Sequence, residues 1–510
     1  MNLLNRLASL LLGGAMLTTA ATMSLAGPDT NIAIVGSAHE PVNLDSATGN
    51  TGFDYPYLYS IYDRLIHFEP DTLELIPGIA TEWRFEGDDN RIFHITLRES
   101  VTFHDGTPCD AEAVKSSLLH FKENGRRGFL NVVDRIEVVD GLNLKLYLKE
   151  EYSVLPAVLA DRAGMISSPT AREKFGEEYQ RNPVGTGPFQ IETWSPGESL
   201  KLKRFADYNG VVEAKLDGIE FRIITSPTAM VSALIAGQID QAYGLDPKNI
   251  PLLKANPKIR VNIEPSLFYY QFMINTTVAP TDNPLVRQAL NISVDRQALV
   301  DAVLGKGASE GPAYAPVPPS HWASTPGYDE KVKYDPERAR ELLAEAGYPD
   351  GITFKVCGTP TVIGYDNNIV DIEREQMKAA GISLEATMLA GNACQKAWAT
   401  GTEYNARQGG FTGRPDPWLT YHNQMGLGGR NNRGKLEYEG VNETLNELLT
   451  TYDRDGQEKL FDELNRLWHV HVPHVLLFYG SNVSAYTNGL VGEEPNAQGK
   501  PNPTSFYFEE

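Results

Sequence analysis

The chain has 510 residues, an ordinary apolar fraction of 41% and a formal net charge of −21. An acidic surface of this size repels phosphate backbones, so nucleic acid is a poor partner for it. At the usual ~150 residues per domain, this length predicts about three structural units.

The first 26 residues have the layout of a secretory signal peptide. One positive charge at Arg6 precedes an apolar stretch at 7–23, and Ser24-Leu25-Ala26 offers a small-x-small cleavage site. An uncleaved membrane anchor is the alternative, but glycine and hydroxyl residues make the stretch a poor lipid-spanning helix. We therefore predict a signal peptide at 1–26 and a mature protein released into the periplasm.

In the first half of the chain, short β-branched runs alternate with helical patterns, which is typical of α/β construction. Asp110 is placed to cap a helix, and Asp140-Gly141 suits a tight hairpin turn. The patterns predict strands at 30–35, 91–97, 135–139 and 143–148, and helices at 57–65 and 110–122.

The second half carries clearer start and stop signals. Asn283-Pro284, Asp295 and Asp335-Pro336 each predict the start of a helix. A strand at 351–357, a helix at 369–380 and a strand at 382–388 predict a parallel βαβ unit. Two segments rich in Pro and Gly, 306–333 and 487–510, are predicted to run over the surface.

The chain has three cysteines, Cys109, Cys357 and Cys394. An oxidising compartment permits one disulfide. Cys357 and Cys394 lie in the same stretch of chain, so we predict a bridge between them that closes a loop of about 38 residues. Three buried free thiols are the alternative.

We find no enzyme signature: neither a Gly-x-Ser-x-Gly elbow nor a His-Glu-x-x-His motif occurs. The best metal candidate is the set His469, His471 and His474. The first two share a face only if the segment is extended, and no acidic general base follows. Ordinary structural histidines are the alternative, and we predict no cofactor and no resident metal.

Aromatic residues gather in three places, at 53–62, at 268–272 and around Arg414-Pro415-Asp416-Pro417. The third group comprises Trp398, Phe411, Trp418, Tyr421 and His422. Aromatic walls with a few charged groups are typical of a small-molecule cleft, although core packing is the better explanation for any single one of these aromatic residues.

Five ordered blocks give the mature chain a resemblance to a known family. They are IYDRLI at 61–66 with PGIATEW at 77–83, FHITLR at 93–98 with VTFHDGTP at 101–108, NPVGTGPF at 182–189, AGQID at 236–240, and VRQAL at 286–290. On these residues the chain resembles the bacterial extracellular solute-binding proteins of family 5, the receptors of peptide and nickel ABC importers.

The resemblance implies a bilobed α/β receptor of the periplasmic-binding-protein type, with an extra domain inserted in the first lobe. Its expected divisions are 27–60 for the first part of lobe I, 61–170 for the inserted domain, 171–271 for the second part of lobe I, 272–478 for lobe II, and 479–510 for a C-terminal return to lobe I. A monomer is expected to close on a solute by hinge motion and to deliver it, unaltered, to the permease subunits of an ABC transporter.

One departure from the family pattern concerns the ligand. Peptide receptors of this family usually carry an Asp after an aromatic-x-x step in the second lobe, where it pairs with the peptide ammonium. Here Phe411-Thr412-Gly413 is followed by Arg414. An arginine there would clamp a carboxylate or phosphate, which favours a small acidic organic solute or an acidic peptide. Alternatively, Arg414 pairs with Asp416 or a neighbouring carboxylate and never contacts ligand.

The resemblance also indicates where the ligand binds. In the first lobe, the family's first strand ends and its cleft begins at positions that match Ala38, His39 and Glu40, with Phe53 and Tyr55 beside them. In the second lobe we expect contacts from Trp398, Arg414, Asp416, Trp418 and Tyr421. A nickel or metal-chelate receptor using His422 or the His469 group is the alternative within the family, and a secreted metal-dependent hydrolase is the alternative outside it.

Overall fold

The computed structural model describes most of the chain beyond the predicted signal peptide. The described residues are 30–49, 51–125, 128–304, 311–328, 332–359, 367–389, 392–495 and 497–509. The predicted signal at 1–26 therefore lies outside the described residues. Within the described part, none of the helices combines the length and the apolar character needed to cross a membrane.

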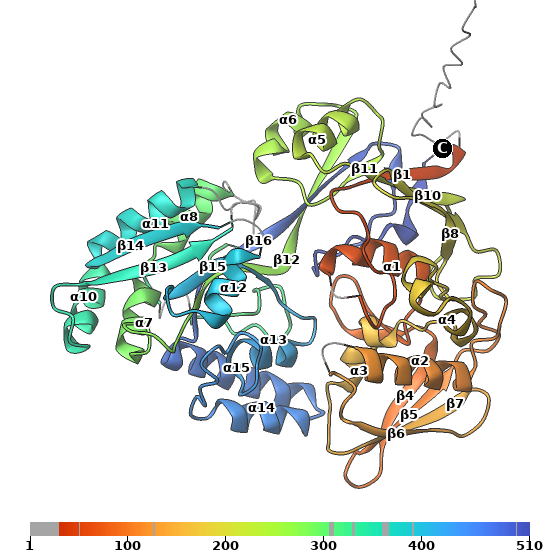
Figure 1. Cartoon of the computed structure of the whole chain (residues 1–510), viewed down its shortest axis with the longest axis horizontal. Helices are drawn as coiled ribbons and strands as arrows, with labels where there is room; N and C mark the ends of the chain where they lie inside the picture. The colour runs from red at the N-terminus through yellow and green to blue at the C-terminus, as the bar shows by residue number, and fades with distance from the viewer. Residues whose placement is uncertain are drawn as a thin grey trace, which may run out of the picture.

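Two lobes lie side by side and share one ten-stranded sheet (Figure 1). The strand order is β14-β13-β15-β12-β16-β11-β1-β10-β9-β8. The strands of the second lobe are β13 (Ile352–Gly358), β14 (Ile382–Met388) and β15 (Ala406–Thr412), and those of the first are β1 (Ile32–Ser37), β8 (Phe189–Ser195), β9 (Ser199–Arg204), β10 (Gly218–Ile223) and β11 (Gln241–Ala242). This is the bilobed α/β fold that the resemblance implies.

Two long antiparallel strands connect the lobes, β12 (Ile259–Ile274) and β16 (His474–Thr487). Their ladder is interrupted by register shifts between Pro265 and Tyr269 and between Tyr270 and Gln271. Such irregularities bend a strand locally, so the connection has a natural bending point near its middle. The boundaries expected at 271/272 and 478/479 fall inside these two strands.

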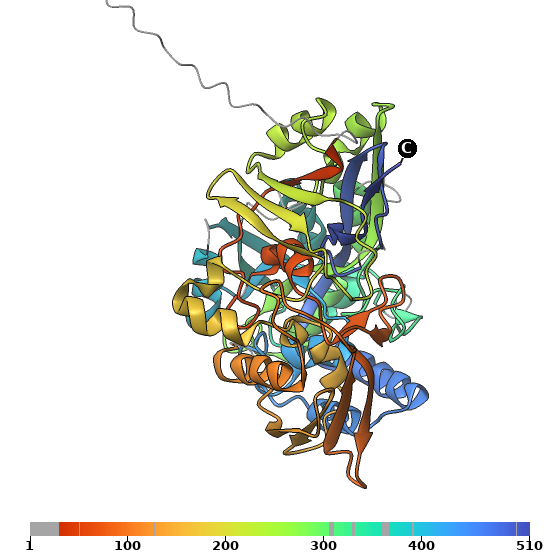
Figure 2. The same ribbon diagram turned by 90° about the vertical axis from the view of Figure 1, so that its right-hand side faces the viewer.

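The first lobe carries a separate antiparallel sheet with the order β4-β5-β7-β6. Its strands are β4 (Ala80–Glu86), β5 (Ile92–Leu97), β6 (Val133–Val138) and β7 (Asn143–Leu148), and helix α2 (Ala111–Asn124) packs against it. The Asp110 side chain accepts from Ala113 N at 2.9 Å, which confirms the predicted cap. The predicted hairpin around Asp140-Gly141 is also confirmed, since β6 and β7 pair antiparallel. In both views this sheet lies at the opposite end of the molecule from the C-terminus (Figures 1 and 2).

The second lobe confirms the predicted βαβ unit, because β13 and β14 are parallel neighbours joined by α11 (Asn367–Ala379). Helices α7 (Pro284–Ile292), α8 (Arg296–Val303) and α10 (Pro336–Glu345) begin where the caps predict. A disulfide joins Cys357 and Cys394 with their Cα atoms 5.6 Å apart, and Cys109 is a buried free thiol. Both outcomes agree with the predicted bridge.

The remaining helices and strands complete the two lobes. They are helices α1 (Tyr55–Ile61), α3 (Leu155–Leu159), α4 (Pro169–Phe175), α5 (Pro227–Ile235), α6 (Ile250–Lys254), α12 (Ala393–Thr400), α13 (Pro417–Met425), α14 (Val441–Leu449) and α15 (Arg454–His471), and strands β2 (Ile66–Phe68), β3 (Leu75–Pro77), β17 (Leu490–Val491) and β18 (Tyr507–Phe508).

The segment predicted to run over the surface at 306–333 is largely packed where it is described. Ala313, Ala315 and Val317 are at most 5% exposed. The Tyr479 hydroxyl lies 2.7 Å from Ala315 O and 2.9 Å from Val317 O, which ties the segment to β16. The prediction was wrong here because small apolar residues between the prolines bury against the neighbouring strand, which composition alone does not reveal.

Candidate functional site

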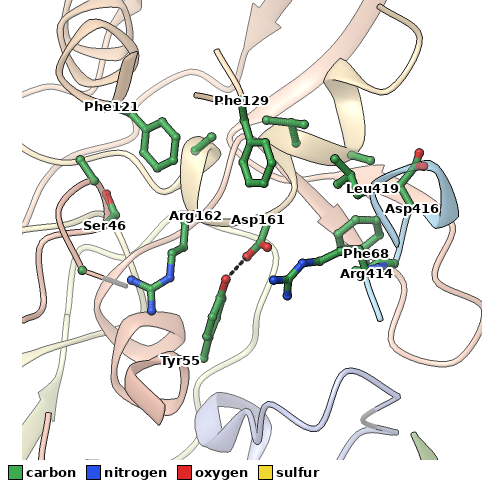
Figure 3. Close-up of a pocket in the computed structure, with 16 residues that line it drawn as sticks. Ser46, Tyr55, Phe68, Phe121, Phe129, Asp161, Arg162, Arg414, Asp416 and Leu419 are labelled. Atoms are coloured by element: carbon green, nitrogen blue, oxygen red, sulfur yellow. Dashed lines mark hydrogen bonds between the residues drawn. The ribbon is translucent and has the colours of Figure 1, made fainter. Parts of the chain in front are cut away.

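A cavity of about 620 Å³, counted with the solvent open to it, lies between the two lobes (Figure 3). The first lobe lines it with residues of 46–68, 121–129 and 157–163. The second lobe contributes Arg414, Pro415, Asp416 and Leu419. The lining combines apolar walls with a few charged groups, which is the composition of a small-molecule site.

Arg414 projects into this cavity from the loop that joins β15 to α13. Backbone bonds hold the loop: Gly413 N donates to Leu267 O at 2.8 Å, and Arg414 N donates to Thr420 Oγ1 at 2.7 Å. The Nε of Arg414 is buried without a hydrogen-bond partner. Among the described residues, no carboxylate lies within ion-pair distance of its guanidinium.

The alternative pairing of Arg414 with Asp416 does not form. The Asp416 carboxylate instead accepts from Trp418 N at 2.9 Å and caps the first turn of α13. Figure 3 shows Arg414 extending toward Asp161 while the Asp416 carboxylate points elsewhere. Burial raises the pKa of Asp416 to about 7, although the Trp418 amide and the charge of Arg454 act in the opposite direction.

Opposite Arg414, the first lobe presents Asp161 at the end of α3. The Tyr55 hydroxyl donates to its Oδ1 at 2.6 Å, and Lys500 Nζ lies 3.6 Å from the same oxygen. Burial alone would raise the pKa of Asp161. Lys500, the Tyr55 hydrogen bond, and the more distant charges of Arg414 and Arg162 outweigh burial and hold that pKa well below its usual range.

Arg162, next to Asp161, is fixed by its surroundings. Its Nη2 donates to Thr51 O at 2.5 Å and lies 3.8 Å from Asp54, and its guanidinium stacks 4.5 Å from the Tyr55 ring centre. Burial raises the pKa of Asp54 to about 6 despite this nearby cation. Figure 3 shows Arg162 and Arg414 on either side of the Tyr55–Asp161 pair.

The charge around the cavity has the opposite sign to the net charge of the whole chain. Arg162, Arg414 and Lys500 face Asp161, while Asp416 is partly protonated near neutral pH. A locally positive interior therefore sits in a chain of net charge −21. Such an interior favours an anionic group on the ligand.

Three of the predicted site residues line the cavity: Tyr55, Arg414 and Asp416. Ala38, His39, Glu40 and Phe53 lie on the loops that follow β1 and precede α1, outside the lining. The His39 ring stacks on Phe53 with ring centres 3.6 Å apart, and Phe53 remains 56% exposed. Glu40 is half-buried, and its Oε1 lacks a hydrogen-bond partner among the described residues.

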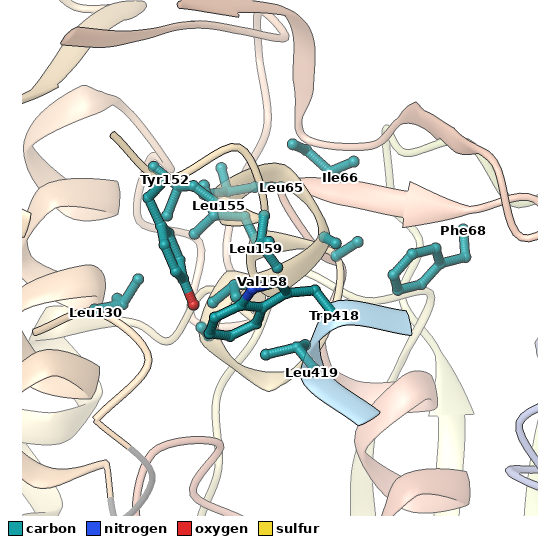
Figure 4. Packing of buried hydrophobic residues seen from close by; sticks show 14 of the residues in the cluster. Leu65, Ile66, Phe68, Leu130, Tyr152, Leu155, Val158, Leu159, Trp418 and Leu419 are labelled. Atoms are coloured by element: carbon teal, nitrogen blue, oxygen red, sulfur yellow. The ribbon is translucent and has the colours of Figure 1, made fainter. Parts of the chain in front are cut away.

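The three other predicted aromatic residues pack in the core behind the cavity wall. Trp398 is buried against the Cys357–Cys394 disulfide. Trp418 donates from Nε1 to Leu445 O at 2.8 Å and projects from α13 against first-lobe residues (Figure 4). The Tyr421 hydroxyl donates to Asn465 Oδ1 at 2.8 Å.

The histidine candidates for metal binding are separated by the fold. His469 and His471 belong to α15, so the extended segment that would bring them to one face does not form, and His474 opens β16. His469 stacks on Tyr328, and His474 Nδ1 accepts from Ile274 N. In the part of the chain that the structure describes, no three His, Cys, Asp or Glu side chains are grouped to hold a metal ion.

Sequence reasoning missed Asp161, Arg162 and Lys500. Asp161 and Arg162 come directly after the apolar run 154–160, and a charged pair at the end of a buried run is the local signal that could have found them. Lys500 lies in the Pro-rich tail, and nothing near it in the sequence links it to Asp161.

Comparison with known proteins agrees with this architecture. The family model of bacterial extracellular solute-binding proteins, family 5, matches residues 74–432. The glutathione-binding protein GsiB of Salmonella paratyphi A is 30% identical over 501 residues, covering 94% of each chain.

Two solved structures share the fold. The periplasmic binding protein DppA of Helicobacter pylori, in complex with the peptide STSA, aligns with a TM-score of 0.80 at 22% identity, over 95% of this chain and 99% of DppA. AgaA of A. tumefaciens R10, in complex with agropinic acid, aligns with a TM-score of 0.80 at 22% identity, over 94% of this chain and 99% of AgaA. The chain therefore belongs to the bacterial extracellular solute-binding proteins of family 5, the binding receptors of ABC importers.

Proposed function

We propose that this receptor captures a small, peptide-like solute carrying a carboxylate and hands it to the membrane permease of its ABC importer. The observation that carries the proposal is Arg414, whose guanidinium enters the cavity between the lobes without a protein partner among the described residues. A buried donor left unpaired costs about 1–3 kcal/mol. A ligand carboxylate would remove that cost through two parallel hydrogen bonds.

The relatives support an acidic ligand. GsiB is named for glutathione, a small peptide with two carboxylates. AgaA was solved with agropinic acid. Asp161 faces Arg414 from the other lobe, but its charge is offset by Lys500, whose Nζ lies 3.6 Å from Asp161 Oδ1. A ligand carboxylate would therefore meet Arg414 without an uncompensated negative charge beside it.

Isothermal titration calorimetry with glutathione and with its diethyl ester tests the proposal. The wild-type protein should bind the acid and not the ester. Arg414→Ala should weaken binding of the acid about 10- to 100-fold, the range of a hydrogen bond to a charged group. Arg338→Ala is the matched control, since Arg338 is an exposed arginine on α10 that pairs with Glu341 and Glu345.

Native mass spectrometry of protein purified without refolding covers the case in which glutathione is not the solute. The retained molecule should carry an acidic group. A retained solute without one, or an unchanged affinity in Arg414→Ala, would remove the arginine from recognition.

We also propose that the mature protein is released into the periplasm after cleavage behind Ala26, since residues 1–26 carry the features of an export signal. Amino-terminal sequencing of protein from the periplasmic fraction should begin at Gly27. A sequence that begins at Met1 would contradict this.

A further inference from the structure

Lys500, in the C-terminal return of the chain, contacts Asp161 and Tyr55, two residues that line the cavity between the lobes. Its side chain is only 7% exposed. The ammonium lies 3.6 Å from Asp161 Oδ1, 3.7 Å from the centre of the Tyr55 ring and 2.8 Å from Gln498 Oε1. The backbone three residues before it is tied to β12, since Leu267 N donates to Ala497 O at 2.7 Å.

These partners are the ones that a free ammonium group needs. An ammonium has three donors and no acceptor, and it binds best to a carboxylate, a neutral oxygen and the face of an aromatic ring. Asp161, Gln498 and Tyr55 supply one of each. The same arrangement would hold the ammonium of a ligand equally well if Lys500 were absent.

The Lys500 side chain and its partners can also be reached from a second side, outside the cavity between the lobes. Lys500 borders a second, more open space, about 1300 Å³ counted with the solvent open to it, that lies between the β2–β3 hairpin and residues 492–505. Phe68 lines both spaces. Shortening the Lys500 side chain would therefore leave a vacancy that small solutes can reach.

We propose that Asp161 and Tyr55 form an ammonium-binding site that the chain fills with its own Lys500, and that Lys500 thereby sets the receptor's preference for ligands without a free ammonium at this end. The site itself follows from the geometry of these residues. The ligand preference rests on the proposed function, because it concerns the solute held by Arg414. In peptide receptors of the family, a second-lobe Asp takes the ligand ammonium, and here that position is Arg414. In this chain the acidic residue is Asp161 of the first lobe, and Lys500 already pairs with it.

Chemical rescue tests the site without any ligand. Lys500→Ala should lower the melting temperature, and about 0.1 M methylammonium should restore much of the loss, since a small ammonium can enter the vacancy. Sodium and tetramethylammonium at equal ionic strength should restore less. Lys500→Met keeps the space filled and should show no rescue.

Lys215→Ala is the matched control. Lys215 also lies over an aromatic ring, 4.2 Å from the centre of Tyr507, but its side chain is 44% exposed and its carboxylate partner Glu213 is on the surface. Methylammonium should not raise its melting temperature beyond the wild-type response. Equal responses of Lys500→Ala and Lys215→Ala would overturn the proposed site.

The proposed ligand preference is tested by comparing the affinities of the protein for glutathione and for N-acetylglutathione. The wild-type protein should bind the acetylated form at least as tightly. In Lys500→Ala the ratio of affinities should shift about tenfold toward the free amine, and an unchanged ratio would overturn the preference. If Lys500→Ala does not fold, Lys500→Gln should show the same shift. Should no carboxylate bind to the wild type, the proposed function fails while the rescue result still decides the site.

Discussion

The two lobes meet in two regions of opposite character. One is the polar corner, formed by Arg414, Asp161 and Lys500, where Lys500 pairs with Asp161 and the Arg414 Nε is buried without a hydrogen-bond partner. The other is the apolar contact, where Trp418 and Leu419 of α13 pack against Tyr152 and Val158 of the first lobe (Figure 4). The two regions therefore have different roles in ligand binding. Hydrophobic contact is non-directional and favours closure whatever the ligand is, whereas the polar corner discriminates between ligands.

Trp418→Ala should have the largest effect on the apolar contact. Trp418 is 9% exposed and meets Tyr152 edge-on with ring centres 6.0 Å apart. Truncation of such a side chain lowers the free energy of unfolding by about 3–5 kcal/mol. Chemical denaturation measures this loss, and X-ray scattering of the ligand-free protein should show a more open shape.

Trp398→Ala is the control that distinguishes an effect on lobe closure from a general loss of stability. Trp398 is 2% exposed but packs inside the second lobe against the disulfide. We expect a similar loss of unfolding free energy and an unchanged scattering profile. If both variants open the molecule equally, the apolar contact has no special part in closure.

The two regions also differ in what the sequence reveals of them. Elements governed by local signals were predicted well: Asn283, Asp295 and Asp335 each cap a helix, and β14 has the predicted bounds. The disulfide followed from redox compartment and proximity in the chain. Local chemistry determines such features, so a single sequence contains them.

The polar corner depends on contacts between distant segments. Comparison with the family pattern indicated Arg414 and Tyr55, but Asp161 and Lys500 meet only because the C-terminal tail returns to the first lobe. The histidine hypothesis failed for a related reason. Alternating His and Val residues at 469–472 suggested an extended segment, yet most of that stretch continues α15, whose apolar face packs through Phe461, Leu464 and Trp468. Tertiary packing outweighed the local pattern.

Asp416 joins the two regions, since it lines the cavity and caps the helix that carries Trp418. Its pKa is about 7 in the folded protein and 3.8 as the ordinary value. Between these values the unfolded chain releases this proton while the folded protein retains it. This group therefore makes stability fall as pH rises from about 4 to 7, by at most about 1.4 kcal/mol per pH unit.

Asp416→Asn should remove this decrease in stability between about pH 4 and pH 7. The amide oxygen can still accept from Trp418 N, but the amide carries no charge. Unfolding titrations at a series of pH values measure it. Asp161→Asn is a control of opposite sign: the pKa of Asp161 is lowered, so its contribution is present above about pH 4 and is lost on acidification. Identical pH profiles for wild type and Asp416→Asn would contradict the assignment.

The smallest expected effect is at the outer edge of the lobe contact. Tyr452 meets Phe85 edge-on at 5.0 Å and donates to Glu151 Oε2 at 3.2 Å, but it is 38% exposed. Tyr452→Phe keeps the ring contact and removes the hydrogen bond, so the unfolding free energy should fall by about 0.5–1 kcal/mol. Ligand affinity should change less than about threefold, because water replaces the lost bond at this exposed site. A larger change in affinity would mean that closure is governed by polar bonds at the rim as well as by the buried rings, and the division between the two regions would no longer hold.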